Sequence, residues 1–367
     1  MTVKRLLALD VFRGATMMLM ILVNTPGSWS YVYPPFRHAA WHGFTLTDLV
    51  FPFFLYIVGV SMWFSMQKSK QSKHVKPIQK IWIRAFKIFI IGTLLRLFPF
   101  FGISFAKIRI MGVLQRIAIA YAVSASLTLK VKLKYLVLIA IGILFGYWWV
   151  LVAFGGNKPF SLEENAVRLL DLKVFGENHL WHGHKIAFDP EGLLSTLPAI
   201  VTVLMGYFSA YVIQRKKLIT AIKSLLIYGS IAFLIGWIWS LIFPINKALW
   251  TSSYVLVTGG IATILLAFLL WIIDEKGMRK WTFLFQVFGK NAILGFVLSG
   301  VIARIFMKIN WMDSEGTKWT AYKWLYAQIF IPLFGKMNGS LGFAIAHIIF
   351  IGFILWFFYK KRIFLKV

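Results

Sequence analysis

The chain has 367 residues, of which 59% are hydrophobic and only 14% are charged, and its mean hydropathy is +0.76. Soluble proteins are about 45–50% apolar and about 25% charged, so an ordinary soluble protein is excluded. The formal charge of +28 would indicate nucleic-acid binding in a soluble chain, but no long polar domain is present to carry it, and we expect no nucleic-acid partner. The sequence contains no cysteine, which excludes disulfides, thiol nucleophiles and cysteine metal sites.

Apolar blocks of about 20 residues, the length that crosses roughly 30 Å of hydrocarbon, recur along the chain. They predict ten membrane-spanning helices, at 7–24, 46–66, 81–99, 110–129, 133–153, 191–213, 220–243, 249–272, 281–308 and 338–359. The stretch 321–335 is shorter and has a lysine near its start, so we expect an interfacial or partly re-entrant helix there rather than an eleventh span. The predicted fold is an all-α, polytopic transmembrane bundle that forms a single domain over residues 1–367.

The basic loops predict the orientation of the bundle. With ten spans they all fall on one side, which the positive-inside rule assigns to the cytoplasm; they lie at 4–5, 68–80, 130–134, 215–217, 276–280 and 360–362. We therefore expect an integral protein of a bacterial inner membrane with both termini cytoplasmic. The longest loop on the opposite side is 154–190, and residues 163–191 hold six of the twelve carboxylates. We expect this loop to form an ordered external cap.

Several ionisable residues lie inside the predicted spans, where each costs at least a few kcal/mol and normally faces the bundle. Asp10 and Arg13 are spaced i, i+3 and are predicted to pair; a structural ion pair and a functional one are equally good interpretations. Arg84 lies near a helix end and can snorkel to the interface. Arg96 and Arg116 have no partner nearby in the sequence, so an anionic ligand is one candidate partner.

The densest polar cluster connects the first two spans and contains Asn24, His38, His42 and Asp48. A histidine at the membrane edge with a carboxylate ten residues later can serve as an oriented general base. A histidine that only caps a helix or binds a backbone carbonyl explains the pattern equally well. From the residues alone, both interpretations stay open.

A second cluster, at 177–184, places His179, His182 and His184 beside Trp181 and Glu177. These side chains could bind zinc, but their spacing matches no standard pair of ligands on one helix face. A platform in which Trp181 packs on a sugar ring is the better hypothesis. The sequence contains no phosphate-binding glycine-rich motif, so ATP- or NAD-driven chemistry has no support.

Longer strings carry a more specific signal. They are RLLALDVFRG at 5–14, HAAWHGFTLTDLVFP at 38–52, GVLQR at 112–116, DPEGLLST at 189–196 and NKALWTSSY at 246–254, together with Asn24. In this order the strings resemble the heparan-alpha-glucosaminide N-acetyltransferase family, from about residue 5 to the end of the chain. Members of that family resemble a wider transmembrane acyltransferase group. They transfer an acetyl group from acetyl-CoA to a terminal glucosamine amine across the membrane.

The resemblance implies that His38 is the catalytic histidine and that Asn24 is an important asparagine. An amine that attacks a thioester needs a base, an oxyanion donor and held reactants. We assign His38 as the base, Asn24 as the oxyanion or orienting donor, and Asp48 as the group that fixes the imidazole. An acetyl-histidine intermediate is an alternative to direct transfer.

The resemblance also implies a donor site and an acceptor site. The donor is acetyl-CoA, used as a co-substrate, and no metal is expected. Candidate donor contacts are Arg116, Gln115, Arg13, Lys130, Lys132 and Lys134, although a role as topology signals is the better explanation of the three lysines. Candidate acceptor contacts are Asp189, Glu191, His179, Trp181, Asn246, Lys247 and Trp250.

Two other classes of function fit the composition. A transporter or flippase for a polar or anionic solute also uses many spans with intramembrane charges, but many transporters carry inverted repeats, and none is visible here. A scaffold or assembly subunit leaves the intramembrane charges unexplained. The family resemblance also allows a homodimer. The identity of the acceptor, an amino sugar or related glycan, and the choice between N- and O-acetylation stay open.

Overall fold

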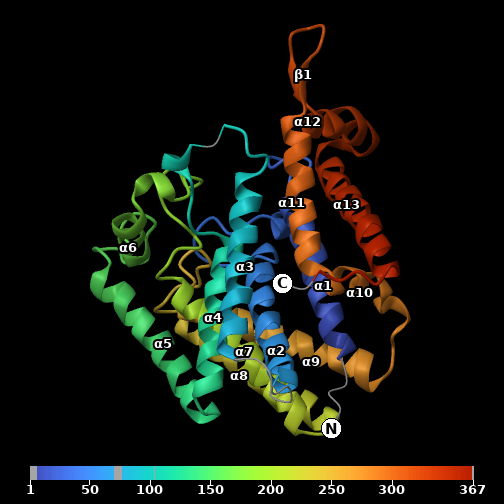
Figure 1. Cartoon of the computed structure of the whole chain (residues 1–367). Helices are drawn as coiled ribbons and strands as arrows, with labels where there is room; N and C mark the ends of the chain where they lie inside the picture. Colours follow the sequence, from blue (N-terminus) through green and yellow to red (C-terminus); the bar gives the residue numbers. More distant parts are fainter. Residues whose placement is uncertain (1–5, 70–76, 103, 366–367) are drawn as a thin grey trace.

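A computed structural model describes residues 6–69, 77–102 and 104–365. The basic segment 4–5 and residues 70–76 of the basic segment 68–80 therefore lie outside the described residues. The chain is mostly helical (Figure 1). The long helices up to residue 269 are α1 (Leu7–Asn24), α2 (Val50–Ser69), α3 (Pro77–Leu97), α4 (Val113–Lys130), α5 (Leu133–Phe154), α7 (Thr196–Arg215), α8 (Leu218–Trp239) and α9 (Ser252–Leu269). The remaining α-helices are α6 (Ala166–Phe175), α10 (Phe283–Lys290), α11 (Ala292–Lys308), α12 (Ala321–Leu325) and α13 (Ile331–Lys360).

Short helical turns link these elements. Single 3-10 turns occur at Pro34–Phe36, Thr47–Leu49, Phe105–Lys107, Glu177–His179 and Lys280–Thr282. Wider π-helical turns extend α9 over Leu270–Glu275 and join α12 to α13 over Tyr326–Phe330. The turn at Thr47–Leu49 leads directly into α2, so it sets the direction in which the preceding polar loop meets the bundle.

Close helix packing at small residues holds the centre of the bundle. A Cβ at Gly59 of α2 would overlap the backbone oxygen of Val203 in α7, and one at Gly206 of α7 would overlap that of Tyr56 in α2. Lipid tails are as apolar as the side chains, so helices in a bilayer associate through such close van der Waals packing. The central helices α1, α2, α7 and α9 are mostly buried, whereas α5 and α8 expose most of their apolar surface. That exposure suits helices that face lipid.

Within the described residues, seven helical segments are long and apolar enough to cross a membrane: Leu7–Asn24, Thr47–Gln67, Leu133–Phe154, Thr196–Arg215, Leu218–Trp239, Ser252–Glu275 and Ala321–Lys360. A helix pair bent by 71°, Lys280–Lys290 with Ala292–Lys308, makes an eighth if it counts as one span. The expected number of ten is therefore not confirmed. Helices α3 and α4 form at the predicted places but are less apolar than these seven segments. In α3 the reason is four cations, Lys80, Arg84, Lys87 and Arg96.

The stretch 321–335 consists of α12, the π-helical turn and the first residues of α13, up to a kink at Gly335. Gly335 adopts φ 73°, a conformation that favours glycine because other residues would place a Cβ there. The Tyr326 hydroxyl donates a hydrogen bond to the carbonyl of Lys336 over 2.8 Å, which closes the turn. The segment is thus broken rather than straight, and its interfacial or re-entrant position stays a prediction.

One element departs from the all-α expectation. Strands β1 (Asn310–Met312) and β2 (Lys318–Thr320) pair antiparallel, with Trp311 opposite Trp319, in a hairpin that projects from the top of the molecule (Figure 1). Asp313 closes the connecting turn, because its carboxylate accepts hydrogen bonds from the Thr317 backbone and from the Trp319 indole. The 3.6-residue periodicity of the flanking helices gives no sign of this local pairing.

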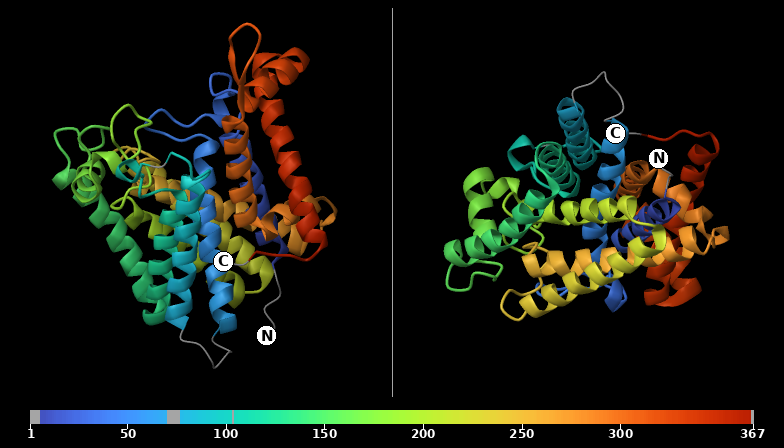
Figure 2. Two further views of the ribbon diagram at one scale, coloured as in Figure 1. Left: turned by 45° about the horizontal axis from the view of Figure 1, so that its top comes forward. Right: turned by 90° about the horizontal axis from the view of Figure 1, so that it is seen from below.

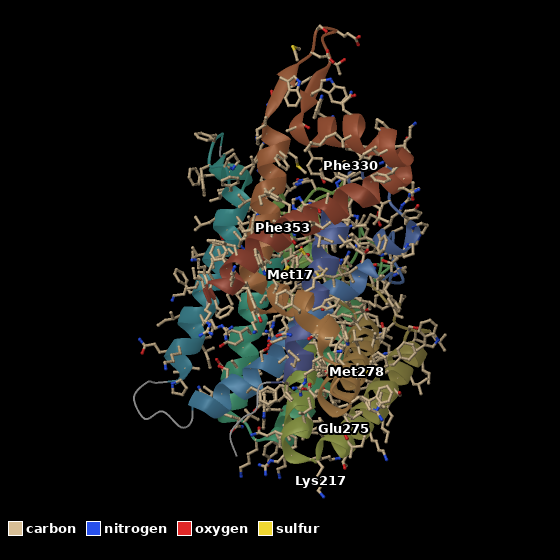
Figure 3. The ribbon with its side chains drawn as sticks, turned by 90° about the vertical axis from the view of Figure 1, so that its right-hand side faces the viewer. Met17, Lys217, Glu275, Met278, Phe330 and Phe353 are labelled. Atoms are coloured by element: carbon tan, nitrogen blue, oxygen red, sulfur yellow. The ribbon has the colours of Figure 1, made fainter. Side chains whose placement is uncertain are left out.

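The two ends of the bundle differ in chemistry. The basic connections that contain Lys217 and Met278 lie at one end, and Phe330 lies towards the other (Figure 3).

The acidic segment 155–195 is ordered and includes α6, whose first turn is capped by Asn165 through a 2.8 Å hydrogen bond from the Arg168 amide. It packs beside α5 and is approached by the loop between α1 and α2 (Figure 2, left). Its position outside the membrane stays a prediction.

Candidate functional site

The loop between α1 and α2 brings His38 and Asp48 together. Nδ1 of His38 lies 2.6 Å from Oδ1 of Asp48, and the carboxylate is almost completely buried while the imidazole is half-exposed. The other carboxylate oxygen accepts hydrogen bonds from the backbone amides of Ala39 and Thr45, over 3.0 and 3.1 Å. Asp48 therefore fixes both the imidazole and the loop that carries it, leaving Nε2 as the ring nitrogen not engaged by this carboxylate.

Lys247 joins this pair from the loop between α8 and α9. Its Nζ lies 3.2 Å from Oδ1 of Asp48 and 3.1 Å from Nδ1 of His38. Burial lowers the pKa of Lys247, and the charges of Asp48 and Glu191 act against that shift. Lys247 is therefore a partly exposed cation that is paired directly with Asp48.

Asn246 builds the loop that presents Lys247. It is fully buried, its side-chain oxygen accepts a hydrogen bond from the Leu249 backbone amide over 2.8 Å, and its backbone amide donates one to the Thr251 hydroxyl. The Gly43 amide donates to the carbonyl of Ile245 over 2.7 Å, which ties the two loops together. Asn246 therefore holds the site in shape, and the structure does not bring its side chain to an open surface.

A cavity of about 630 Å³ begins at this cluster and extends along α1 and α2. At one end it is lined by Asn24, His38, Glu191 and Lys247. Its other lining residues include Met17, Met20, Phe51, Phe54, Ile57, Ile88, Ile117, Phe296, Arg13, Ser61, Arg84, Lys290 and Leu365. Arg13 and Asn24 are eleven positions apart on α1, which corresponds to about 16 Å along a helix. The cavity is therefore long, with an apolar middle and polar groups at both ends.

Asn24 is the last residue of α1 and lines the cavity, as a donor near His38 would have to. Its amide donates to the carbonyl of Met20 over 2.9 Å, a bond within its own helix. The structure shows Asn24 and His38 on one cavity without a direct hydrogen bond between them in the described residues.

The far end of the cavity carries three cations, of which Arg13 has a carboxylate partner and Lys290 and Arg84 contact tyrosines. Arg13 pairs with Asp10 at 3.3 Å, as the i, i+3 spacing predicted, and also donates to the Ser61 hydroxyl over 2.6 Å. Lys290 donates to the Tyr359 hydroxyl over 3.2 Å. The guanidinium carbon of Arg84 lies 5.0 Å from the centroid of the Tyr121 ring, and its buried Nε has no hydrogen-bond partner among the described atoms.

Next to this end, the segment 361–365 crosses from α13 back towards the middle of the bundle (Figure 1). Asn291, buried at the bend between α10 and α11, donates to the carbonyl of Ile363 over 3.1 Å and accepts from the Leu365 amide over 3.2 Å. Leu365 thereby becomes part of the cavity rim.

A buried ionic network supports the His38 end of the cavity. Arg109 binds both carboxylate oxygens of Asp189, over 2.7 and 2.8 Å, and also pairs with Glu191. Burial by itself lowers the pKa of Arg109, but the hydrogen bonds to Asp189 and the charge of Glu191 raise it above its ordinary value. Asp189 is fully buried in this pairing, so of the two predicted acceptor carboxylates only Glu191 reaches the cavity.

The GVLQR residues that we predicted as donor contacts lie inside the protein. Arg116 is fully buried, hydrogen-bonds to the Ser195 hydroxyl and packs with its guanidinium carbon 4.9 Å from the centroid of the Trp250 ring. Gln115 is also buried, with its amide 3.2 Å from the Thr93 hydroxyl. Neither these residues nor Trp250 line the cavity, so their positions favour support of the fold over ligand contact.

The remaining predicted contacts lie away from the cavity. Lys130, Lys132 and Lys134 flank the turn between α4 and α5. His179 is bound through Nδ1 to the carbonyl of Ile108, 2.7 Å away. Trp181 stands between the Arg109 guanidinium, 5.8 Å from its ring centroid, and the His184 ring. Across the described residues, no group of three or more His, Asp or Glu side chains is arranged to hold a metal ion.

Three residues of the cavity and its support, Arg109, Ser61 and Lys290, were not predicted from the sequence. Arg109 comes just before GVLQR, and its place next to a family-matched string was a signal that could have found it. Ser61 and Lys290 offered none, because each faces the cavity only through the packing of α2 and of the α10–α11 bend.

Comparisons with known proteins match this chain to one family. The family model described as "Heparan-alpha-glucosaminide N-acetyltransferase, catalytic" matches residues 5–243, which include Asn24, His38, Asp48 and Glu191. Two curated proteins named heparan-alpha-glucosaminide N-acetyltransferase, from Mus musculus and Homo sapiens, are each 30% identical to the chain and cover 82% of it. The aligned region is 54% of each relative, so the chain spans about half their length.

Proposed function

Since the chain belongs to the heparan-alpha-glucosaminide N-acetyltransferase catalytic family, we propose that it is an integral membrane acyltransferase. It moves an acetyl group from acetyl-CoA to the amine of a terminal glucosamine or related extracytoplasmic glycan. The observation that carries the proposal is the His38–Asp48 pair at one end of a long cavity whose other end holds cations. A thioester threaded along that cavity would reach the imidazole.

The acetyl group would be transferred to the acceptor at the His38 end of the cavity. His38, oriented by Asp48, takes a proton from the acceptor amine, the amine nitrogen attacks the acetyl carbon, and the C–S bond breaks to release the CoA thiolate. Asn24 lines the same end and would turn its amide towards the oxyanion. Glu191 supplies a carboxylate that can bind an acceptor ammonium or hydroxyl group. His38 can also act as acyl carrier in a two-step transfer, which a burst of acetyl-enzyme would reveal.

The donor, acetyl-CoA, would bind with its nucleotide at the opposite end of the cavity. Arg13, Arg84 and Lys290 line it and would bind the phosphates of the nucleotide, since phosphate oxygens favour guanidinium and ammonium partners. The apolar middle would hold the extended pantetheine arm. This assignment replaces Lys130, Lys132 and Lys134, which lie away from the cavity.

The same proposal fixes the topology. The donor end faces the cytoplasm together with both termini, α3 and α4 complete a set of ten spans, and segment 154–190 caps the external side. The basic connections that contain Lys217 and Met278 lie at the same end of the bundle, which supports this orientation (Figure 3). Because the chain has no cysteine, single cysteines introduced at Lys217 and Trp311 can be labelled with an impermeant maleimide in intact cells. Labelling of position 311 alone supports the orientation, and labelling of 217 alone reverses it.

The activity is tested with purified protein in detergent, radiolabelled acetyl-CoA and glucosamine, with heat-denatured protein as the blank. Labelled N-acetylglucosamine from the native protein is the expected result. Failure to transfer to any of a panel of amino sugars and glycans, when equilibrium dialysis also detects no CoA binding, contradicts the proposal and favours a transporter of polar or anionic solutes.

A further inference from the structure

Lys247 places a primary amine inside a site proposed to acetylate amines. Its side chain lines the cavity together with His38 and is held by a loop that Asn246 and Thr251 fix through buried hydrogen bonds. Nζ lies 3.1 Å from the imidazole Nδ1 of His38 and 3.2 Å from Oδ1 of Asp48. Chemically, Lys247 resembles the acceptor that the same base is proposed to activate.

We infer that Lys247 is a self-acetylation site, which receives the acetyl group of a bound thioester when no acceptor fills the His38 end of the cavity. The inference rests on the proposed function, because it requires an acetyl thioester as donor. In the His38 tautomer that carries its proton on Nε2, the Lys247 ammonium gives one proton to Nδ1, 3.1 Å away, and the imidazolium that forms is paired with Asp48. The Lys247 nitrogen then forms a bond to the acetyl carbon. The C–S bond breaks, the CoA thiolate takes the second proton from nitrogen, and the first proton passes from the imidazole to water.

The surroundings of Lys247 favour this reaction over acetylation of other lysines. Burial lowers its pKa, which increases the fraction of neutral, nucleophilic amine. Lys290 lines the same cavity at the opposite end, where its Nζ is bound to the Tyr359 hydroxyl. When the thioester of a bound donor lies at His38, the part of the donor next to Lys290 is its nucleotide end, which carries no acetyl group. The two lysines are therefore an internal comparison between a reactive and an unreactive amine in one cavity.

Acetylation would change the site in two ways. The amide that forms carries no charge, so the ion pair with Asp48 is lost, and the added acetyl group occupies space that an acceptor needs. Acetyl-Lys247 would not return its acetyl group, because an amide is far less reactive than a thioester. Self-acetylation is thus an inactivation that an acceptor prevents by occupying the site.

The experiment incubates the full-length protein in detergent with radiolabelled acetyl-CoA alone, or with glucosamine added, and maps the label by peptide mass spectrometry. We expect one acetyl group on Lys247 and none on Lys290, with at least about tenfold less label in the presence of glucosamine and in the His38→Ala variant. The Lys247→Arg variant keeps a cation next to Asp48 but lacks the amine. It should take up no label at this position, and its own initial rate, whatever that value is, should stay constant during incubation with the donor.

Each outcome bears on the inference separately from the proposed function. Labelled N-acetylglucosamine with no label on Lys247 keeps the acetyltransferase and overturns the inference, as does label on His38 alone. Equal labelling of Lys247 and Lys290, unaffected by His38→Ala, indicates uncatalysed acetylation and also overturns it. Absence of both sugar and protein labelling, when the protein also fails to bind CoA, contradicts the proposed function itself.

Discussion

The two ends of the cavity are built differently. At the His38 end the charged groups hold one another: His38 and Lys247 share Asp48, and Glu191 is held by Arg109. At the opposite end Arg13 is paired with Asp10, but Lys290 and Arg84 contact tyrosines instead of carboxylates. Charges paired at fixed distances keep a reacting group in place, whereas cations with neutral partners keep their charge for an anion that arrives. The difference predicts that the two ends can be impaired separately.

Replacement of His38 with alanine should have the largest effect. Loss of the base is expected to lower kcat about 10²–10⁴-fold while the affinity for CoA stays within about twofold, because the cations at the other end are untouched. Initial rates and equilibrium binding of CoA measure the two quantities on the same preparation. A variant that folds and turns over at the wild-type rate would show that His38 is not the base.

The Asp48→Asn variant separates orientation from chemistry. It keeps the shape of the side chain but removes the charge that orients the imidazole and pairs with Lys247. We expect kcat to fall about 10²-fold and the KM for acetyl-CoA to change little. Because the same carboxylate also anchors the loop through Ala39 and Thr45, the thermal midpoint of the variant should be measured alongside. A rate equal to wild type would reduce Asp48 to a structural role.

At the opposite end, Lys290→Gln and Arg84→Gln should act on donor binding. Each change is expected to raise the KM for acetyl-CoA about tenfold, equivalent to about 1.4 kcal/mol, with kcat nearly unchanged. Lys132→Gln is the matched control, since this lysine lies at the α4–α5 turn and away from the cavity. If Lys132→Gln raises KM and the cavity variants do not, the donor phosphates bind at the basic turn instead.

The smallest effect concerns Asp171, a buried carboxyl group of α6 behind the His38 end. Burial raises its pKa to about 7, although a hydrogen bond from the Leu193 amide acts against this. Because the pKa is higher in the folded than in the unfolded state, protonation of Asp171 stabilises the folded protein. This contribution is complete below about pH 4 and is lost as the pH rises to about 7. The thermal midpoint should therefore fall by a few degrees from pH 5 to pH 8.

Asp171→Asn should flatten that dependence, because the amide cannot ionise. Glu163→Gln, a change at an exposed carboxylate of the same segment, should leave the slope as it is. Equal slopes for wild type and Asp171→Asn would show that another group is responsible for the pH dependence.

Some features of the site follow from local sequence. Apolar blocks place helices where they occur, because a helix satisfies its own backbone hydrogen bonds in lipid. The Asp10–Arg13 pair follows from one helical turn. His38 and Asp48 were expected to act together, and the structure places their side chains 2.6 Å apart, whereas the role of His38 as base stays a proposal.

Other features depended on packing. The sequence placed Arg116, Arg13 and the lysines at 130–134 in one group of donor candidates, but only Arg13 reaches the cavity. Lys247 was expected near the acceptor, yet nothing in the sequence indicated that it would meet Asp48, 199 positions earlier in the chain. The span count of ten also depended on treating α3 as apolar despite its four cations.

The sequence by itself therefore determined the membrane class, the positions of the long helices and the local polar pairs. Only the tertiary structure decided which cations face the cavity and which carboxylates are already paired. The physical reason is that hydropathy and spacing fix where a helix runs, whereas the face it presents and the loops it meets depend on contacts between segments far apart in the chain.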